Sequence, residues 1–152
     1  MDVPYLIRPA TSADAPALAA LERATFSDPW PAEAFVALGA GVSAFVAEAV
    51  GVLGFVIIRQ VADEAELLDI VVRQDRRREG IGTALLDRAQ ATAAEAGARA
   101  LFLEVRASNT PAQAFYRRHG FSVIGRRARY YRTPPEDAVV MRCDVMPVTP
   151  DA

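Results

Sequence analysis

Short apolar runs, several of them alternating with polar residues, mark the first half of the chain and predict β-strands. They lie at 5–10, 42–49, 52–60 and 65–72. Val50-Gly51 separates the second run from the third, which indicates a hairpin. The fourth run is rich in β-branched residues, as strands usually are.

Helical periodicity appears between the first two strands. Residues 14–26 repeat apolar side chains at helical spacing behind Thr11 and Ser12, which are candidate N-caps. The sequence SDPWP breaks this helix, and Pro31 is expected to begin a second one.

The second half alternates helices with strands. Helices are predicted at 82–96 and 109–119, and strands at 100–108, 121–131 and 138–145. The order of elements predicts a mixed α/β sheet with helices on both faces, not a strict βαβ repeat. We expect one domain over 1–146, followed by a loose C-terminal tail at 147–152.

Composition narrows the function classes. The 152 residues carry 17 basic and 19 acidic side chains, and the net charge of −2 argues against a globally basic nucleic-acid binder. A single cysteine, Cys143, and a single histidine, His119, offer few ligands for a metal. The N-terminus has no secretory signal pattern, and no apolar run is long enough to span a bilayer. We therefore expect a cytoplasmic protein without a metal, a membrane partner or a nucleic-acid partner.

The segment RQDRRREGIGTA at 73–84 is a candidate anion site. Gly80 and Gly82 stand where a strand gives way to a helix, so backbone N–H groups at the positive end of the helix dipole can approach a ligand. No lysine follows Gly82, which argues against a P-loop, and Leu85 occupies the place of a third Rossmann glycine. A solvated charged turn is the alternative.

Three residues downstream could carry chemistry. Glu104 interrupts a strand otherwise built for burial, and partial burial of a carboxylate favours proton uptake, as a general base requires. The alternative is an ion pair with Arg106. Asn109 and Tyr116 lie almost two helical turns apart, about 10 Å along the axis. Asn109 could instead cap the helix, and Tyr116 could instead be a core residue.

The motif Arg77-Arg78-Glu79-Gly80-Ile81-Gly82 matches the Gln/Arg-x-x-Gly-x-Gly/Ala motif of the GCN5-related N-acetyltransferases, or GNAT family. Four further segments resemble the RimI-type subfamily, the alanine N-acetyltransferases of ribosomal protein S18. They are FSDPWPAEAF at 26–35, LEVRASN at 103–109, AFYRRHGF at 114–121, and a C-terminal segment that contains RRARYY at 126–131 and EDAVVM at 136–141. The resemblance covers nearly the whole chain.

The resemblance implies a GNAT fold, in which a mixed, mostly antiparallel sheet of six to seven strands is flanked by about four helices. It implies acetyl-CoA as co-substrate and a protein N-terminus, the alanine of ribosomal protein S18, as acceptor. We expect a monomer or weak dimer. Glu104 would be the base and Tyr116 the acid that protonates the CoA thiolate. The implied cofactor contacts are Ile70, Val71, Val72, Arg77, Arg78, Glu79, Gly80, Ile81, Gly82, Thr83 and Asn109. The implied acceptor contacts are Tyr130, Tyr131 and Asp69, the last also a weaker candidate base.

Two other functions stay open from the sequence. One is acetylation of a small-molecule amine on the same fold, since substrate range changes easily on one scaffold. The other is an anion- or RNA-binding module without catalysis. Within the glycine turn, we expect Arg78 to lie nearest the phosphates and Arg73 and Arg76 to be mainly solvated.

Overall fold

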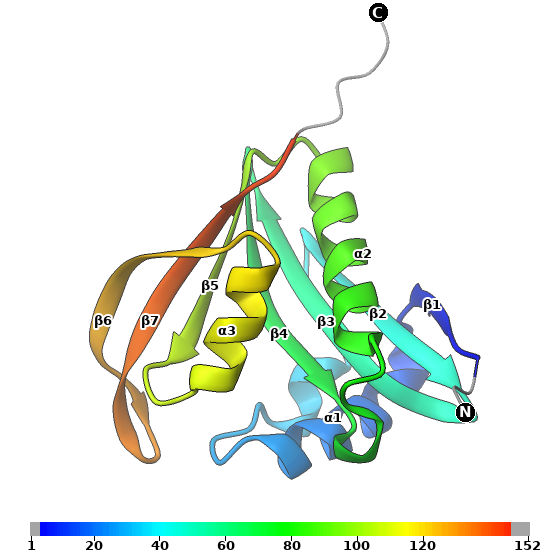
Figure 1. Ribbon diagram of the computed structural model, residues 1–152. Coiled ribbons are helices and arrows are strands. Elements are labelled where there is room, and N and C mark those ends of the chain that lie inside the picture. Colours follow the sequence, from blue (N-terminus) through cyan, green and yellow to red (C-terminus); the bar gives the residue numbers. More distant parts are fainter. Residues whose placement is uncertain (1–3, 147–152) are drawn as a thin grey trace, which may run out of the picture. The chain divides into compact units, whose positions relative to one another are not determined.

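Seven strands form one sheet in the computed structural model of the chain, which describes residues 4–146 (Figure 1). The strands are β1 (Leu6–Pro9), β2 (Val42–Ala49), β3 (Gly51–Val61), β4 (Glu64–Val72), β5 (Ala100–Arg106), β6 (Ser122–Arg132) and β7 (Pro135–Asp144). They are hydrogen-bonded in the order β1-β2-β3-β4-β5-β7-β6. The pairs β1/β2, β2/β3, β5/β7 and β6/β7 are antiparallel, whereas β4 and β5 are parallel. The predicted mixed, mostly antiparallel sheet is confirmed.

Within residues 4–146, three α-helices and three short 3-10 helices accompany the sheet. The α-helices are α1 (Ala15–Thr25), α2 (Ile81–Glu95) and α3 (Thr110–Arg118), and the 3-10 helices are η1 (Ser12–Asp14), η2 (Ala32–Phe35) and η3 (Gln74–Arg76). The helix expected after Pro31 is therefore only the 3-10 turn η2. The tail predicted at 147–152 lies outside the described residues.

The contacts divide the chain into two compact units. Unit 1 runs to Arg59 and includes Leu67–Thr92, and unit 2 comprises Gln60–Glu66 and the chain from Ala93 onward. The single domain expected over 1–146 stays a prediction. No helix among residues 4–146 is long and apolar enough to cross a membrane.

In unit 1, α1 and α2 cover opposite faces of the strands (Figure 1). The face under α1 and η2 holds one apolar cluster because inward residues alternate along each strand. Its buried members are Ala15, Leu18, Ala19, Phe35, Val46, Phe55, Ile57 and Val71. On the other face α2 buries Leu85 and Leu86, and the Arg88 guanidinium lies 4.7 Å from the ring centroid of Phe45.

In unit 2, β7 is the central strand. It pairs with β5 from Ala100↔Asp144 to Arg106↔Ala138, and with β6 along its other edge. The β6/β7 register shifts twice, between Val123 and Gly125 and between Arg127 and Tyr131. Such bulges bend and twist a strand, so they re-aim the side chains around them.

Candidate active site

The glycine turn of unit 1 connects β4 to α2 through backbone conformations that few residues adopt. Gly80 has a φ of +84° and Arg78 a φ of +65°. Gly80 directly precedes the helix α2, and its carbonyl accepts the N–H of Ala84 at 3.0 Å. The first N–H groups of a helix have no acceptor within it, so this turn can present donors to an anion.

Most arginines of this turn have partners close by. Arg73 pairs with Asp75 at 2.6 Å, and Arg77 Nε donates to the carbonyl of Val72 at 3.2 Å. Arg76 pairs with Glu79 at 2.8 Å, and its side chain is only 16% exposed. The expectation that Arg76 is mainly solvated is therefore wrong, because this ion pair folds the side chain back onto the turn.

A close backbone approach that the sequence did not reveal occurs at Gly54 of β3. A Cβ atom at this position would lie 2.6 Å from the carbonyl oxygen of Val71 and 3.3 Å from Leu85 Cδ1. Only glycine allows β3 to pass this close to the end of β4 and to α2. The available signal was an isolated glycine inside a strand run, which often marks such an approach.

We expect Gly54→Ala to lower the free energy of unfolding by about 1–3 kcal/mol, the usual cost of overpacking a filled core. The backbone of β4 would have to move, because the clashing atom is a carbonyl oxygen and not the end of a flexible side chain. Urea unfolding measures the loss. Gly125→Ala is the control, since nothing lies within 4 Å of a Cβ there. Equal stability of the two variants would contradict the close approach.

In unit 2, Glu104 projects from the middle of β5, opposite Val140 of β7. Its Oε1 lies 3.4 Å from Arg127 Nε, and its side chain is 18% exposed. Its Oε2 is buried and has no hydrogen-bond partner among the described residues. The alternative ion pair with Arg106 is wrong, because Arg106 pairs with Glu136 at 3.2 Å. Glu104 thus has one buried oxygen to which no described residue donates a hydrogen bond.

Two tyrosines of β6 lie near this carboxylate. A hydrogen bond with Glu104, together with burial, raises the pKa of Tyr130. Burial and the neighbouring Tyr130 raise the pKa of Tyr131 to about 12. The two rings pack edge to face at 5.1 Å, and the Arg106 guanidinium lies 4.3 Å from the Tyr131 centroid. Both phenols are therefore neutral near pH 7 and can act as hydrogen-bond donors.

The helix α3 carries the other two predicted residues of unit 2. Asn109 is its N-cap, and the Asn109 side chain accepts the N–H of Ala112 at 3.2 Å. Tyr116 is buried, and its ring packs edge-on against Phe121 at 5.6 Å and Phe115 at 5.5 Å. The capping alternative for Asn109 and the core alternative for Tyr116 are both confirmed, and neither excludes a role in cofactor contact or proton transfer.

Gln113 joins β5 to α3 and was missed by sequence reasoning. The residue is buried, and its Nε2 donates to the carbonyls of Arg106 at 3.1 Å and Ala107 at 3.0 Å. It thereby satisfies backbone acceptors where β5 ends, two residues beyond Glu104. The sequence of an amphipathic helix does not distinguish a buried glutamine that binds backbone carbonyls from a glutamine exposed to solvent.

Asp69 of β4 differs from an ordinary substrate contact because it is almost fully buried. Burial, and then hydrogen bonding with Glu22, raise its pKa to about 10. No group of three or more side chains among residues 4–146 could hold a metal ion.

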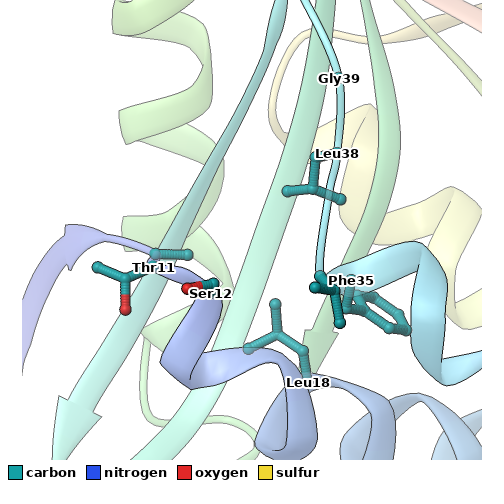
Figure 2. A pocket seen from close by; sticks show the side chains of 8 residues that line it. Thr11, Ser12, Leu18, Phe35, Leu38 and Gly39 are labelled. Atoms are coloured by element: carbon teal, nitrogen blue, oxygen red, sulfur yellow. The ribbon is translucent and has the colours of Figure 1, made fainter.

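A separate pocket in unit 1 has a volume of about 210 Å³ (Figure 2). Its lining residues are Ala10, Thr11, Ser12, Leu18, Phe35, Val36, Leu38 and Gly39. None of them belongs to the predicted site. The lining contains no ionisable side chain, so it is poorly suited to a ligand that carries phosphate groups.

The predicted residues thus form two groups. In unit 1, Asp69, Ile70, Val71 and Val72 lie consecutively on β4, and the turn at 77–83 follows them along the chain. In unit 2, Glu104 lies beside Tyr130, while Asn109 and Tyr116 lie on α3 or at its cap.

The chain is similar to known proteins over most of its length. The family model described as "Acetyltransferase (GNAT) family" matches residues 10–121. The [ribosomal protein bS18]-alanine N-acetyltransferase of Escherichia coli K12 is 43% identical over 89 residues, which are 57% of this chain. The match spans 60% of the length of that relative.

Two further similarities are more extensive. A Bacillus subtilis protein, provisionally given the same enzyme name, is 34% identical over 125 residues, 80% of this chain and 83% of its own. The crystal structure of the ribosomal-protein-S18-alanine N-acetyltransferase from Escherichia coli has a TM-score of 0.87 and 31% identity. That similarity covers 98% of this chain and 99% of the other.

Proposed function

Because the chain belongs to the acetyltransferase (GNAT) family, we propose that it transfers an acetyl group from acetyl-CoA to a protein N-terminal amine. The proposed acceptor is the N-terminal alanine of ribosomal protein S18. The observation that carries the proposal is the similarity to the crystal structure of the Escherichia coli ribosomal-protein-S18-alanine N-acetyltransferase, which covers 98% of this chain at 31% identity. The unpaired Oε2 of Glu104, which has no partner among the described residues, supports the chemical part.

The glycine turn fits the pyrophosphate of acetyl-CoA. Gly80 adopts a positive φ immediately before α2, so the first helical N–H groups can point at an anion without a side chain in the way. Arg78 adds an exposed cation beside them. The backbone groups of Ile70, Val71 and Val72 would bind the pantetheine arm, and Asn109 would contribute a further contact. When bound, acetyl-CoA supplies an activated thioester.

The proton transfers are assigned to unit 2. Glu104 Oε2 accepts a proton from the substrate ammonium, since it is the buried oxygen of that carboxylate left without a partner among the described residues. The free amine forms a C–N bond with the thioester carbon, and the C–S bond breaks. Backbone N–H groups stabilise the oxyanion. Tyr116 donates its phenolic proton to the departing thiolate, and no covalent enzyme intermediate is required.

Tyr130 and Tyr131 are proposed to contact the acceptor peptide. Tyr130 lies within the second bulge of β6 and Tyr131 at its end, and Tyr130 reaches Glu104 from there. An acceptor amine near Glu104 would therefore meet a phenol that is neutral and able to donate a hydrogen bond.

A thiol-release assay with acetyl-CoA and a panel of acceptors tests the proposed function. We expect release with a basic peptide that begins with the alanine of S18, and none with the same peptide already acetylated at its N-terminus. Mass spectrometry of S18 from cells with and without the gene should show loss of the acetyl group in the deletion strain. Release with small amines alone would instead indicate a small-molecule acetyltransferase. No release with any acceptor, together with tight RNA binding, would indicate a binding module.

A further inference from the structure

Two carboxyl side chains meet inside unit 1. Glu22 of α1 is 2% exposed and Asp69 of β4 is 7% exposed. Asp69 shares a strand face with Leu67 and Val71, because alternate residues of β4 point the same way, and Val71 belongs to the cluster under α1. Glu22 is the charged side chain that acts on Asp69, so the two carboxyl groups lie close together at the packed surface between α1 and β4.

Each carboxyl has one buried oxygen without a hydrogen-bond donor. These atoms are Glu22 Oε1 and Asp69 Oδ2, which have no such partner among the described residues. Two ionised carboxylates in contact in an apolar surrounding would repel each other strongly. One proton held between the two side chains removes that repulsion and turns one carboxyl into a donor to the other.

Among the described residues, no cation acts on the Asp69 carboxyl. Glu22 is the ionisable side chain that acts on Asp69, while the N–H of Ile70 on the same strand opposes the effect. The elements packed around α1 and β4 supply apolar side chains at this cluster. They are Phe35 of η2, Val46 of β2, and Phe55 and Ile57 of β3. A proton shared between the two carboxyls would therefore lower the charge of the pair where no neighbouring cation does so.

The pair also holds the segment that follows α1. Glu22 Oε2 accepts the main-chain N–H of Trp30 at 3.0 Å. The Trp30 ring stacks on Phe35 at 5.5 Å, and Phe35 packs edge-on against Phe55 at 5.8 Å. Phe35 is also part of the pocket wall in Figure 2. The neighbouring carboxyls of Asp69 and Glu22, and the hydrogen bond from Trp30 to Glu22, thus connect β4 to residues 26–35 inside one unit.

We propose that Glu22 and Asp69 share a single buried proton, and that this proton ties residues 26–35 to β4. Asp69 then acts as a hydrogen-bond donor to Glu22 and not as a base, and Glu22 acts as a positioning residue for the Trp30 segment. Loss of the proton leaves two adjacent buried charges and loosens the segment. Proton binding by this pair occurs within unit 1 and does not depend on the proposed acetyl transfer.

The stability of the protein should therefore depend on pH through Asp69. The pKa of Asp69 rises from 3.8 to about 10 on folding, so the folded state holds the proton over a range in which the unfolded state has lost it. The stabilisation is complete below pH 3.8, falls steadily as the pH rises from there towards about 10, and is gone above the folded-state value. Asp69→Asn keeps a donor to Glu22 but needs no proton.

Urea unfolding of the wild type and Asp69→Asn, measured from about pH 6 to about pH 9, tests the shared proton. The folding constant of the Asn variant divided by that of the wild type should rise by up to about tenfold per pH unit. The control is Asp75→Asn, because Arg73 lowers the pKa of exposed Asp75 and its carboxyl is ionised throughout this range. A ratio that stays constant for Asp69→Asn would overturn the proposal.

The fluorescence of Trp30, the single tryptophan of the chain, directly reports whether residues 26–35 stay attached to β4. In the wild type we expect the emission to shift to longer wavelength as the pH rises towards about 10, because the Trp30 segment loosens when Asp69 loses its proton. The shift should be absent from Asp69→Asn, while changes caused by tyrosine ionisation should be common to both proteins. Identical curves would overturn the proposal, and so would the absence of a shift in the wild type, a result that does not depend on the stability of the variant.

Discussion

Glu104→Gln should lower kcat by about 10²–10⁴-fold at saturating acetyl-CoA, the usual contribution of a positioned general base. The amide keeps the size of the side chain but cannot take a proton from the substrate ammonium. Acetyl-CoA affinity should change little, because the cofactor contacts are assigned to other residues. Steady-state thiol release gives kcat, and calorimetric titration gives the affinity for acetyl-CoA.

Tyr116→Phe is the companion variant for the acid. Removing the hydroxyl leaves the ring contacts with Phe121 and Phe115 available, so the fold should persist. Glu64→Gln is the control for loss of a carboxylate from a strand, because Glu64 is exposed at the start of β4. Near wild-type turnover in both Glu104→Gln and Tyr116→Phe would show the acid/base assignment to be wrong.

Gly80→Asp should weaken acetyl-CoA binding by on the order of tenfold or more, because two effects act together. A side chain at a φ of +84° costs roughly 1–2 kcal/mol, and it distorts the turn from which the first N–H groups of α2 would reach the pyrophosphate. The new carboxylate also repels the phosphates. Isothermal titration with acetyl-CoA measures the change.

Gly51→Asp is a closely matched control for this effect. Gly51 also has a φ of +84°, and no atom lies within 4 Å of a Cβ there. The control therefore shares the backbone strain and the added charge, but it lies in the β2–β3 hairpin. Unchanged affinity in Gly80→Asp, or equal weakening in both variants, would remove the anion site from the 77–83 turn.

Local features of the structure were predictable from the sequence because short-range physics determines them. The alternating runs became strands, and Asn109 became the cap of α3. Gly80 has the positive φ that a glycine permits at the strand-to-helix turn. The length of the second helix was not predictable in this way, because a 3-10 turn and a longer helix share the same start signal at Pro31.

Contacts between distant residues could not be predicted in the same way. Arg106 was the nearest cation to Glu104 in sequence, yet the bulged strand β6 brings Arg127 to that carboxylate instead. Glu22 and Asp69 are separated by 47 positions, 69 − 22, and no local pattern indicates that they touch. Each of these contacts depends on the pairing of strands or on the packing of a helix against a sheet.

The two bulges of β6 also bear on self-association. β6 ends the strand order, so its outer backbone edge could template another strand, a common route to fibre growth. Register shifts at 123–125 and 127–131 break the regular spacing of its backbone groups, and the strand carries Arg126, Arg127, Arg129 and Arg132. A second copy would meet an irregular edge and like charges. The distortion that brings Tyr130 to Glu104 therefore also makes this edge a poor template for sheet extension between molecules.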